Sequence, residues 1–317
     1  MKKFLVGLLV GIVLSVFAGI VVAFAFARLS EREPAVPESS VLRLTVSGPV
    51  EEMAGFSLPI PGQPPSGLTT LEIWSSLRKA AVDSRIKAVI FEPVMPGLGW
   101  ATAQEIRGSI EKFRKDSGKP VYAILRMPRM VDYYMASAAD KVYASPEDML
   151  LMQGMRLEVM YLKNTLDKIG VTVEVEHAGK YKDAGDQFTE TAMTPETREV
   201  LTSVLDDLYN DFLTATGASR KKSREEMAAL IDQGPFTATA AMKAGLIDGL
   251  KYEEQITDEI KGELKLAEYN ETSVRNYRDI SPASLGSGPG SRLQVVIDDD
   301  GRGIESDRRE SVMARGA

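Results

Sequence analysis

Residues 177–190, HAGKYKDAGDQFTE, bring together several side chains that can move protons. They include the single histidine of the chain, His177, and two lysines, Lys180 and Lys182, on either side of a tyrosine. The chain has no cysteine, which excludes disulfides, thiolate nucleophiles and cysteine-based metal sites, and one histidine excludes a multi-histidine metal site. Nucleophilic chemistry is therefore narrowed to a serine or threonine activated by lysine, or to carboxylates acting with water.

A lysine serves as a general base only when its pKa is lowered by burial or by nearby cations. Lys180 and Lys182 both follow an apolar stretch, VTVEVEHAG at 171–179, that predicts a strand, and the turn after a strand is a suitable place for such a lysine. His177 is an alternative base, although a lone histidine at a strand end is more often a surface or packed residue. Ser137 and Ser145 are candidate nucleophiles by residue type alone.

Three carboxylates, Asp183, Asp186 and Glu190, surround these lysines. They are candidates for a metal site or a glycosidase-like acid–base pair. Their place at a predicted helix start is explained more simply by interaction with the helix dipole and by capping. No cofactor is implied by the sequence.

Helices that alternate with short apolar strands must position these groups. Strands are predicted at 41–50, 87–94, 120–126, 141–146 and 171–179, and helices at 71–86, 101–119, 133–140 and 160–170. This order predicts an α/β domain with parallel strands and right-handed crossovers.

A long helix follows the lysines, with Thr194 as its cap and Pro195 in its first turn. Its apolar stripe, which we expect to pack in the core, comprises Val200, Leu201, Val204, Leu205, Leu208 and Phe212. Two short helices around a Gly-Pro turn are predicted within 224–250, and 253–264 closes the folded region.

Both ends of the chain differ in composition from the middle. Residues 4–27 carry no charge and are long enough to cross a bilayer, so 1–27 predicts a membrane anchor, with Lys2 and Lys3 favouring a cytoplasmic N-terminus. A cleaved signal peptide is the alternative, but apolar cores of signal peptides are shorter. Residues 28–40 form a polar stalk, 41–272 the main domain outside the cytoplasm, and 273–317 a linker and tail. A net charge of −7 without a basic, aromatic groove argues against nucleic acid as a partner.

The segment GKYKDAGDQFTETAMTPETREVLTSVLDDLYNDF, residues 179–212, resembles the lysine-bearing segment of the signal peptide peptidase A (SppA) family, membrane-anchored serine proteases of the ClpP/crotonase superfamily. The resemblance runs from VLRLTVSG at 41–48 to about residue 255. It implies a ClpP/crotonase-like domain of repeated β-β-α units, preceded by one transmembrane helix. It also implies that Lys182, directly after the tyrosine, accepts the proton of a serine that attacks a peptide carbonyl.

The nucleophile position departs from the family pattern. In short members a serine precedes two glycines and a tyrosine pair. Placing Tyr133 and Tyr134 on that pair puts Met130 at the serine and Val131 and Asp132 at the glycines. Methionine cannot be the nucleophile of an acyl transfer. The oxyanion segment is altered as well, because FEPVMPGLGW at 91–100 keeps two glycines, Gly97 and Gly99, without the usual order.

Long family members are tandem duplications in which the N-terminal half contributes the lysine and the C-terminal half the serine, and the half-sites meet in an oligomer. This chain resembles such an N-terminal half, with 281–297 as the junction to a truncated second half. The predicted function is a serine endopeptidase of the bacterial inner membrane that hydrolyses cleaved signal peptides, working as a homo-oligomer or with a serine-bearing half. The alternative is a non-catalytic, peptide-binding or oligomerising pseudoenzyme. An acyl-CoA-binding crotonase relative is a third possibility that the anchor and the Tyr-Lys motif disfavour.

Overall fold

The computed structural model describes residues 36–53, 67–176, 178–281 and 285, together with residues 3, 7, 11, 12, 14–19, 21 and 22. It divides into a large unit, Pro37–Arg278, and a second unit made of the two terminal segments, 1–36 and 279–317. Most of the predicted anchor, of the stalk and of the junction at 281–297 lies outside the described residues. Within the part of the chain that is described, no helix has the length and hydropathy needed to span a bilayer.

Six parallel strands form the main sheet of the large unit, in the order β7-β4-β3-β2-β1-β8. Their bounds are β1 Ser40–Pro49, β2 Ile86–Gly97, β3 Val121–Leu125, β4 Lys141–Ala144, β7 Gly249–Leu250 and β8 Asn270–Ser273. The apolar runs of β1 to β4 are nearly continuous because most of each strand is covered on both faces, as parallel sheets require. The predicted parallel α/β fold is confirmed.

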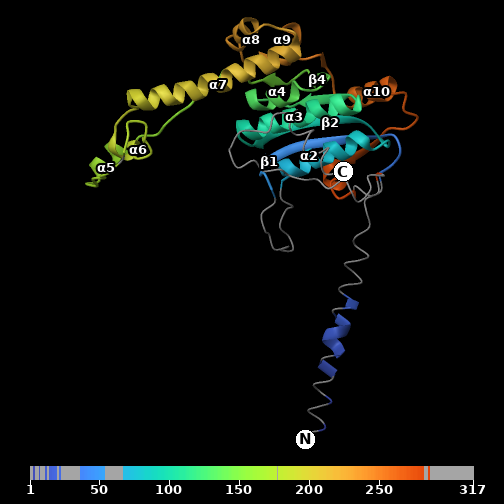
Figure 1. Cartoon of the computed structure of the whole chain (residues 1–317). Helices are drawn as coiled ribbons and strands as arrows, with labels where there is room; N and C mark the ends of the chain where they lie inside the picture. The colour runs from blue at the N-terminus through green and yellow to red at the C-terminus, as the bar shows by residue number, and fades with distance from the viewer. Residues whose placement is uncertain are drawn as a thin grey trace, which may run out of the picture. The chain divides into compact units, whose positions relative to one another are not determined.

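Three helices connect the first four strands and cover one face of the sheet: α2 Thr70–Val82, α3 Trp100–Ser117 and α4 Met130–Ala136 (Figure 1). The hydroxyl of Thr69 accepts from the N–H of Glu72, and the Glu72 carboxylate accepts from the N–H of Thr69, so α2 begins with a capping box. Gly118 ends α3 with a φ of 65°, the left-handed conformation expected of a glycine C-cap.

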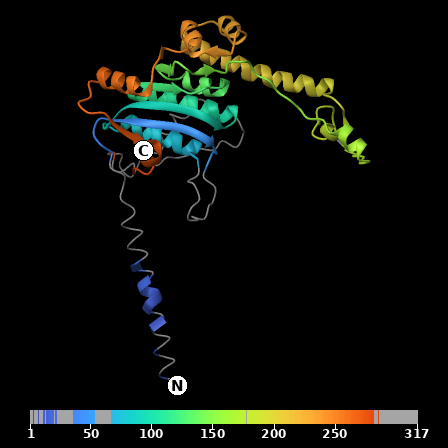
Figure 2. The ribbon, with the colours of Figure 1, turned by 180° about the vertical axis from the view of Figure 1, so that it is seen from behind.

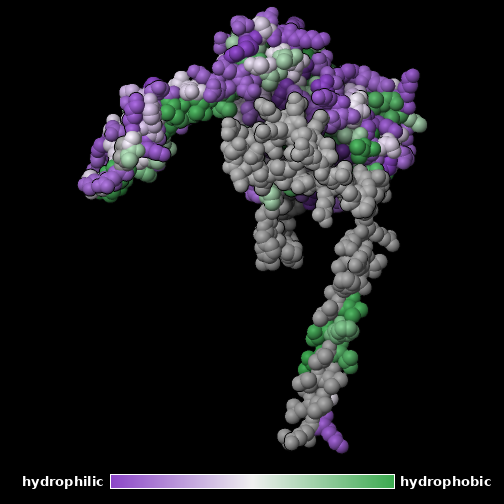
Figure 3. Space-filling view, in the orientation of Figure 1, coloured by the Kyte–Doolittle hydropathy of each residue, from purple (hydrophilic) through white to green (hydrophobic). Residues whose placement is uncertain are grey.

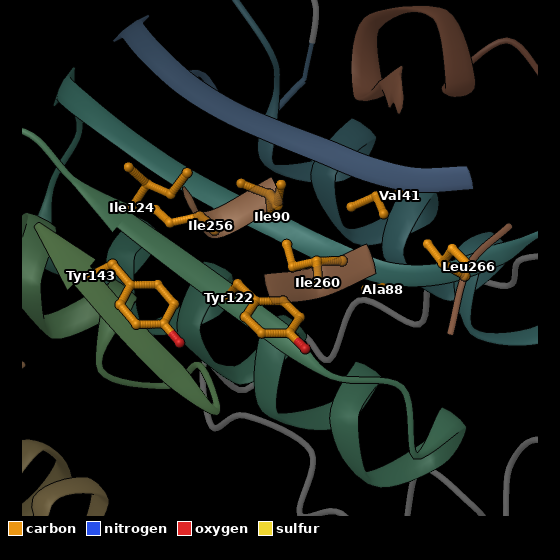
Figure 4. Close-up of a cluster of buried hydrophobic side chains, with 9 residues drawn as sticks. All are labelled: Val41, Ala88, Ile90, Tyr122, Ile124, Tyr143, Ile256, Ile260 and Leu266. Carbon is orange, nitrogen blue, oxygen red and sulfur yellow. The ribbon is translucent and has the colours of Figure 1, made fainter. Parts of the chain in front are cut away.

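The opposite face of the sheet is covered by α10, Glu253–Glu263 (Figure 4). The buried cluster there comprises Val41, Ala88, Ile90, Tyr122, Ile124, Tyr143, Ile256, Ile260 and Leu266. Polar tips of this cluster are bound as well, because the Tyr122 hydroxyl donates to Glu263 (2.7 Å) and the Tyr143 hydroxyl to Glu259 (2.8 Å). Apolar packing and hydrogen bonds therefore both fix α10 on the sheet.

Residues 153–205, called the arm below, leave the sheet and return to it through the long helix α7, Pro195–Arg220 (Figures 1 and 2). The arm also contains α5, Lys163–Lys168, and α6, Asp186–Thr189, which the two views place toward the N-terminal end of α7. The remaining elements lie outside the arm: β5 Met149–Leu150, α8 Arg224–Ile231, β6 Phe236–Thr237, α9 Ala238–Lys243 and α11 Val274–Tyr277.

Three expectations differ from the structure. Residues 171–176 form no strand; their alternating pattern has no neighbouring strand in the described arm. The stripe of α7 is only partly core, since Phe212 is buried whereas Val200 and Val204 are 41% and 46% exposed. The resemblance implies repeated β-β-α units, but each of the strands β1 to β3 of the main sheet is followed by one helix. The strands β5 and β6 pair with each other in a separate antiparallel sheet.

Candidate functional site

Met130, at the position where the family pattern has its serine, is the first residue of α4, just beyond the carboxyl end of β3. Its side chain is buried, with 7% of the residue exposed. A thioether at this place offers neither a proton to transfer nor an attacking oxygen. The structure therefore buries an inert apolar side chain at the position that the resemblance aligns with the family serine.

An ion pair fixes the backbone around Met130. Asp132 is fully buried and accepts from Nε of Arg129 at 2.9 Å, from Nη2 of Arg129 at 3.0 Å and from the Arg129 backbone N–H at 2.9 Å. Nη2 of Arg129 also donates to the carbonyl oxygen of Pro96 at 2.8 Å. The start of α4 is thereby tied to Pro96, next to the altered segment that contains Gly97 and Gly99.

The tyrosine pair after Asp132 has a packing role. Tyr133 is fully buried and its hydroxyl donates to the carbonyl of Leu246 (2.8 Å); burial raises the pKa of Tyr133 to about 12. The Tyr134 hydroxyl donates to Asp211 of α7 (2.9 Å), and burial followed by this hydrogen bond raises its pKa. Both hydroxyls keep their protons near neutral pH, so neither is a general base.

Lys182 lies in the arm, in a turn before α6, and its side chain is exposed. Its backbone N–H donates to the carbonyl of Gly179 at 3.2 Å. The neighbouring Tyr181 hydroxyl donates to Glu199 of α7 at 3.2 Å, which ties the turn to the long helix. Gly185 lies so close to Val175 that an added Cβ would stand 2.4 Å from a Val175 methyl carbon. The tight backbone approach after the lysine therefore requires a glycine.

Lys182 and Met130 are not brought together within this chain. Met130 starts a helix on the sheet, whereas Lys182 precedes α6, which both views show well away from α4 (Figures 1 and 2). The role of Lys182 as a base stays a prediction. A lysine base has to be desolvated, and the surroundings of Lys182 in this chain leave it in water.

The other candidates from the sequence have structural partners. The buried Ser137 Oγ accepts from Nη1 of Arg107 (2.7 Å) and donates to the Tyr134 carbonyl, and the Ser145 Oγ donates to Glu147 (2.8 Å). Lys180 is exposed, with its Nζ 4.6 Å from the centre of the Tyr181 ring. His177 lies outside the described residues.

The carboxylates of the lysine segment do not gather into a metal site. Asp183 and Asp186 are half-buried and Glu190 is exposed. Asp186 is the first residue of α6, and Glu190 is its C-cap. Over the described residues, no group of three or more potential ligands could hold a metal ion.

Sequence reasoning missed two arginines that organise this region, Arg129 and Arg107. Arg129 and Asp132 are three residues apart across a helix start, a spacing that could have indicated their ion pair. Arg107 on α3 is buried, and its guanidinium bonds to both α4 and α7. A single arginine on an amphipathic helix gives no comparable signal.

Comparison with known proteins identifies a family that matches part of this chain. The family model described as Peptidase family S49 matches residues 113–267, which include both Met130 and Lys182. The chloroplastic serine protease SPPA of Arabidopsis thaliana is 28% identical over 265 residues, covering 83% of this chain and 38% of the relative. Protease 4 of Salmonella typhi is 28% identical over 228 residues, covering 68% of this chain and 37% of the relative.

The chain spans about two fifths of the length of these two curated relatives. Among solved structures, a complex of the 1510-N membrane-bound stomatin-specific protease with a substrate peptide covers 76% of this chain and 93% of that one, with 12% identity and a TM-score of 0.40. The residues that carry the assignment are those of the sequence match, which runs from α3 through the arm to the end of α10. Residues 113–267 therefore match peptidase family S49, and the curated relatives that the chain resembles are named as proteases.

Proposed function

We propose that this chain is the lysine-bearing half of a peptidase of signal peptide peptidase A type, with Lys182 as general base and the nucleophilic serine supplied by a partner. One observation carries the proposal: within the matched region the chain keeps the Tyr181-Lys182 motif but has Met130 at the nucleophile position. A chain with one half of a Ser-Lys dyad needs the other half for acyl transfer.

In this proposal the Nζ of Lys182, unprotonated in a desolvated site, takes the proton from the partner's serine hydroxyl as that oxygen attacks a peptide carbonyl. It then gives the proton to the leaving amine, and water completes hydrolysis of the acyl-enzyme by the same route. The exposure of Lys182 on the arm is consistent with this reading, because the arm has unpacked surface that a partner can cover. Covering it would remove water from the lysine, as a lysine base requires.

We propose further that residues 4–27 anchor the chain in a bilayer and hold the large unit on the extracytoplasmic side, where cleaved signal peptides are the substrates. Uncharged residues over that length support the anchor, and Lys2 and Lys3 support the orientation. A protease added outside spheroplasts should then digest the large unit. Digestion only after lysis would reverse the proposed orientation.

The test of the dyad uses the full chain in detergent, mixed with the serine-bearing half of a long family member and a fluorogenic apolar peptide. We expect cleavage by the mixture and none by the chain alone. Lys182→Ala should lower kcat/KM of the mixture by at least about 10³-fold, because it removes the base that activates the serine.

Lys180→Ala is the matched control, since Lys180 is the other exposed lysine of the same turn. It should leave cleavage within about twofold of the parent. Chemical cross-linking of the mixture establishes that the two halves associate. Cleavage that survives Lys182→Ala in a cross-linked complex would contradict the assignment of the base.

A second function, peptide binding without cleavage, is favoured by the ion pair at the start of α4. Arg129 and Asp132 form an ion pair next to the position that the resemblance aligns with the family serine. Arg129 also donates a hydrogen bond to the Pro96 carbonyl. In this reading the chain retains peptides, or its partner, without chemistry of its own. Anisotropy of a labelled apolar peptide that rises with the chain, while the cross-linked mixture shows no cleavage, would favour it over the dyad.

A further inference from the structure

The long helix α7 is attached to the sheet at one end only. Its C-terminal part, from Asp211 to Arg220, contacts α4 and α3 through the buried Phe212 ring and through hydrogen bonds at Asp211 and Ala215. Toward the N-terminus, among the described residues from 153 to 211, only Thr197 is buried. The N-terminal part of α7 therefore projects from the packed body, and the segment that contains Lys182 is joined to that part (Figures 1 and 2).

Because α7 is long and is held at one end, a small rotation at the packed end causes a large displacement at the other end. From Ala215 to Pro195 the helix rises about 30 Å at 1.5 Å per residue. A rotation of about 10° at Ala215 would move Pro195 by about 5 Å over that length. Displacements near 1 Å can lower a rate by about 100-fold when reacting groups must be aligned. The angle of α7 therefore has to be fixed closely if the arm carries a reacting group.

Two kinds of contact hold the attached end. Phe212 packs against aromatic rings, with centroid distances of 6.3 Å to Trp100 and 6.2 Å to Tyr134. Such packing stabilises the contact but is tolerant of rotation, because apolar contact is not directional. Hydrogen bonds are directional, so the groups that bond to α7 determine its angle.

Tyr134 of α4 provides one such bond, from its hydroxyl to Asp211, and Arg107 of α3 provides two more from the protein interior. Its Nη2 donates to the Ala215 carbonyl at 3.1 Å and to the Ser219 Oγ at 2.8 Å, both on α7. Its Nη1 donates to the Tyr134 carbonyl at 2.6 Å and to the Ser137 Oγ at 2.7 Å, both at α4. The side chain is 6% exposed. One rigid, planar group thus fixes two helices relative to a third.

We propose that Arg107 is a positioning residue for catalysis: it sets the angle of α7 and, through that angle, the place that Lys182 takes at a partner's serine. This inference rests on the proposed role of Lys182. The clamp on α7 itself is independent of that role, because it depends only on contacts within the chain. Structure and activity therefore need separate measurements.

The angle of α7 can be measured directly because the chain has no native cysteine. In the full chain, Lys112→Cys on α3 and Ser203→Cys on α7 place spin labels at two exposed positions, and pulsed electron paramagnetic resonance gives their distance distribution. We expect one narrow distance in the parent. Arg107→Gln should broaden it or shift it by several ångströms. Ser219→Ala, which removes one acceptor at an exposed site, should broaden it less without endangering the fold.

Arg114 supplies the matched control. It lies two turns further along α3, and its guanidinium bonds to the Ala138 carbonyl and to Asp140 rather than to α7. Arg114→Gln should leave the distance distribution unchanged. Identical distributions in the parent, Arg107→Gln and Ser219→Ala would overturn the clamp.

The catalytic part is tested in the mixture with the serine-bearing half. Arg107→Gln should lower kcat by about 100-fold with KM within about twofold, and Arg107→Lys should recover part of the loss. A broadened distance with an unchanged kcat would refute positioning while leaving the dyad standing. An inactive parent mixture would refute the proposed function and the catalytic part of this inference, while the distance data still decide the clamp.

Discussion

The sheet and the arm of this chain differ in how far their apolar side chains are buried. In the sheet, every strand from β1 to β4 is covered on both faces, and 5 of 5 residues of β3 are buried. In the arm, large apolar side chains such as Met160 and Ile169 are 72% and 68% exposed. A closed core stabilises the first region, whereas the second region has apolar surface without a partner in the described chain (Figure 3).

The two halves of the proposed chemistry lie on opposite sides of this division. Met130, which the resemblance aligns with the family serine, belongs to the packed body, and Lys182 belongs to the exposed arm. A site needing both regions would have to be completed by another chain that covers the arm. Removing contacts in the body should therefore unfold the large unit, while equivalent changes in the arm should leave its stability unchanged.

The largest difference is expected between two apolar residues of the same helix. Phe212→Ala removes a fully buried ring at the anchored end of α7 and should destabilise the fold by about 3–5 kcal/mol. Val204→Ala, at a 46% exposed position of the same helix, should change stability by less than about 0.5 kcal/mol. Urea unfolding followed by fluorescence of Trp100, which contacts Phe212, measures both. Equal losses for the two variants would mean that the arm packs as tightly as the body.

This division also explains what the sequence predicted. Strands β1 to β4 and their helices were predicted because the apolar periodicity of each element reflects the core it packs on, as with Ile106 and Ile110 on α3. The prediction of a strand at 171–179 was wrong. The alternation of Val171, Val173 and Val175 indicates a segment with one apolar face, but a strand also needs a neighbouring strand, which the pattern does not identify. Lys182 could be proposed from its motif. Its exposure, and the clamp by Arg107, depend on contacts between elements far apart in the sequence.

A second comparison uses two carboxylates. Asp132→Asn replaces a fully buried carboxylate bound to Arg129, and the loss of charge-assisted hydrogen bonds should cost about 1.5–3 kcal/mol. Asp183→Asn, in the arm, should stay within about 0.5 kcal/mol of the parent. The urea midpoints of the two variants provide the check. A neutral Asp132→Asn would show that the ion pair at the start of α4 contributes little to the fold.

Acid should loosen the body through α10. Burial opposes ionisation of Glu259, but hydrogen bonds from Lys141, Lys251 and Tyr143 lower its pKa from 4.5 to about 2. Because the folded-state pKa is the lower one, this contribution is complete above about pH 4.5 and is lost as pH falls toward 2. Allowing for solvent screening, the loss should be on the order of 1–2 kcal/mol.

Unfolding midpoints measured between pH 5 and about pH 2.5 test this, with Glu259→Gln as the control that cannot titrate. The parent should lose more stability than Glu259→Gln over this range, and the difference is the share of Glu259. Parallel pH profiles would place the acid sensitivity elsewhere in the body.

The smallest expected effect comes from the backbone near the carboxyl end of β2. Met95, near the end of β2, has a φ of 44° and is 59% exposed, so its side chain offsets little of the strain of a left-handed conformation. Met95→Gly removes that strain but increases the entropy of the unfolded chain, and the net effect should be a gain of about 0.5 kcal/mol. Met160→Gly, at an exposed arm position outside any helix or strand, has no such strain to relieve and should give no gain. A gain of equal size at both positions would mean that the unfolded state, and not the conformation at Met95, determines the result.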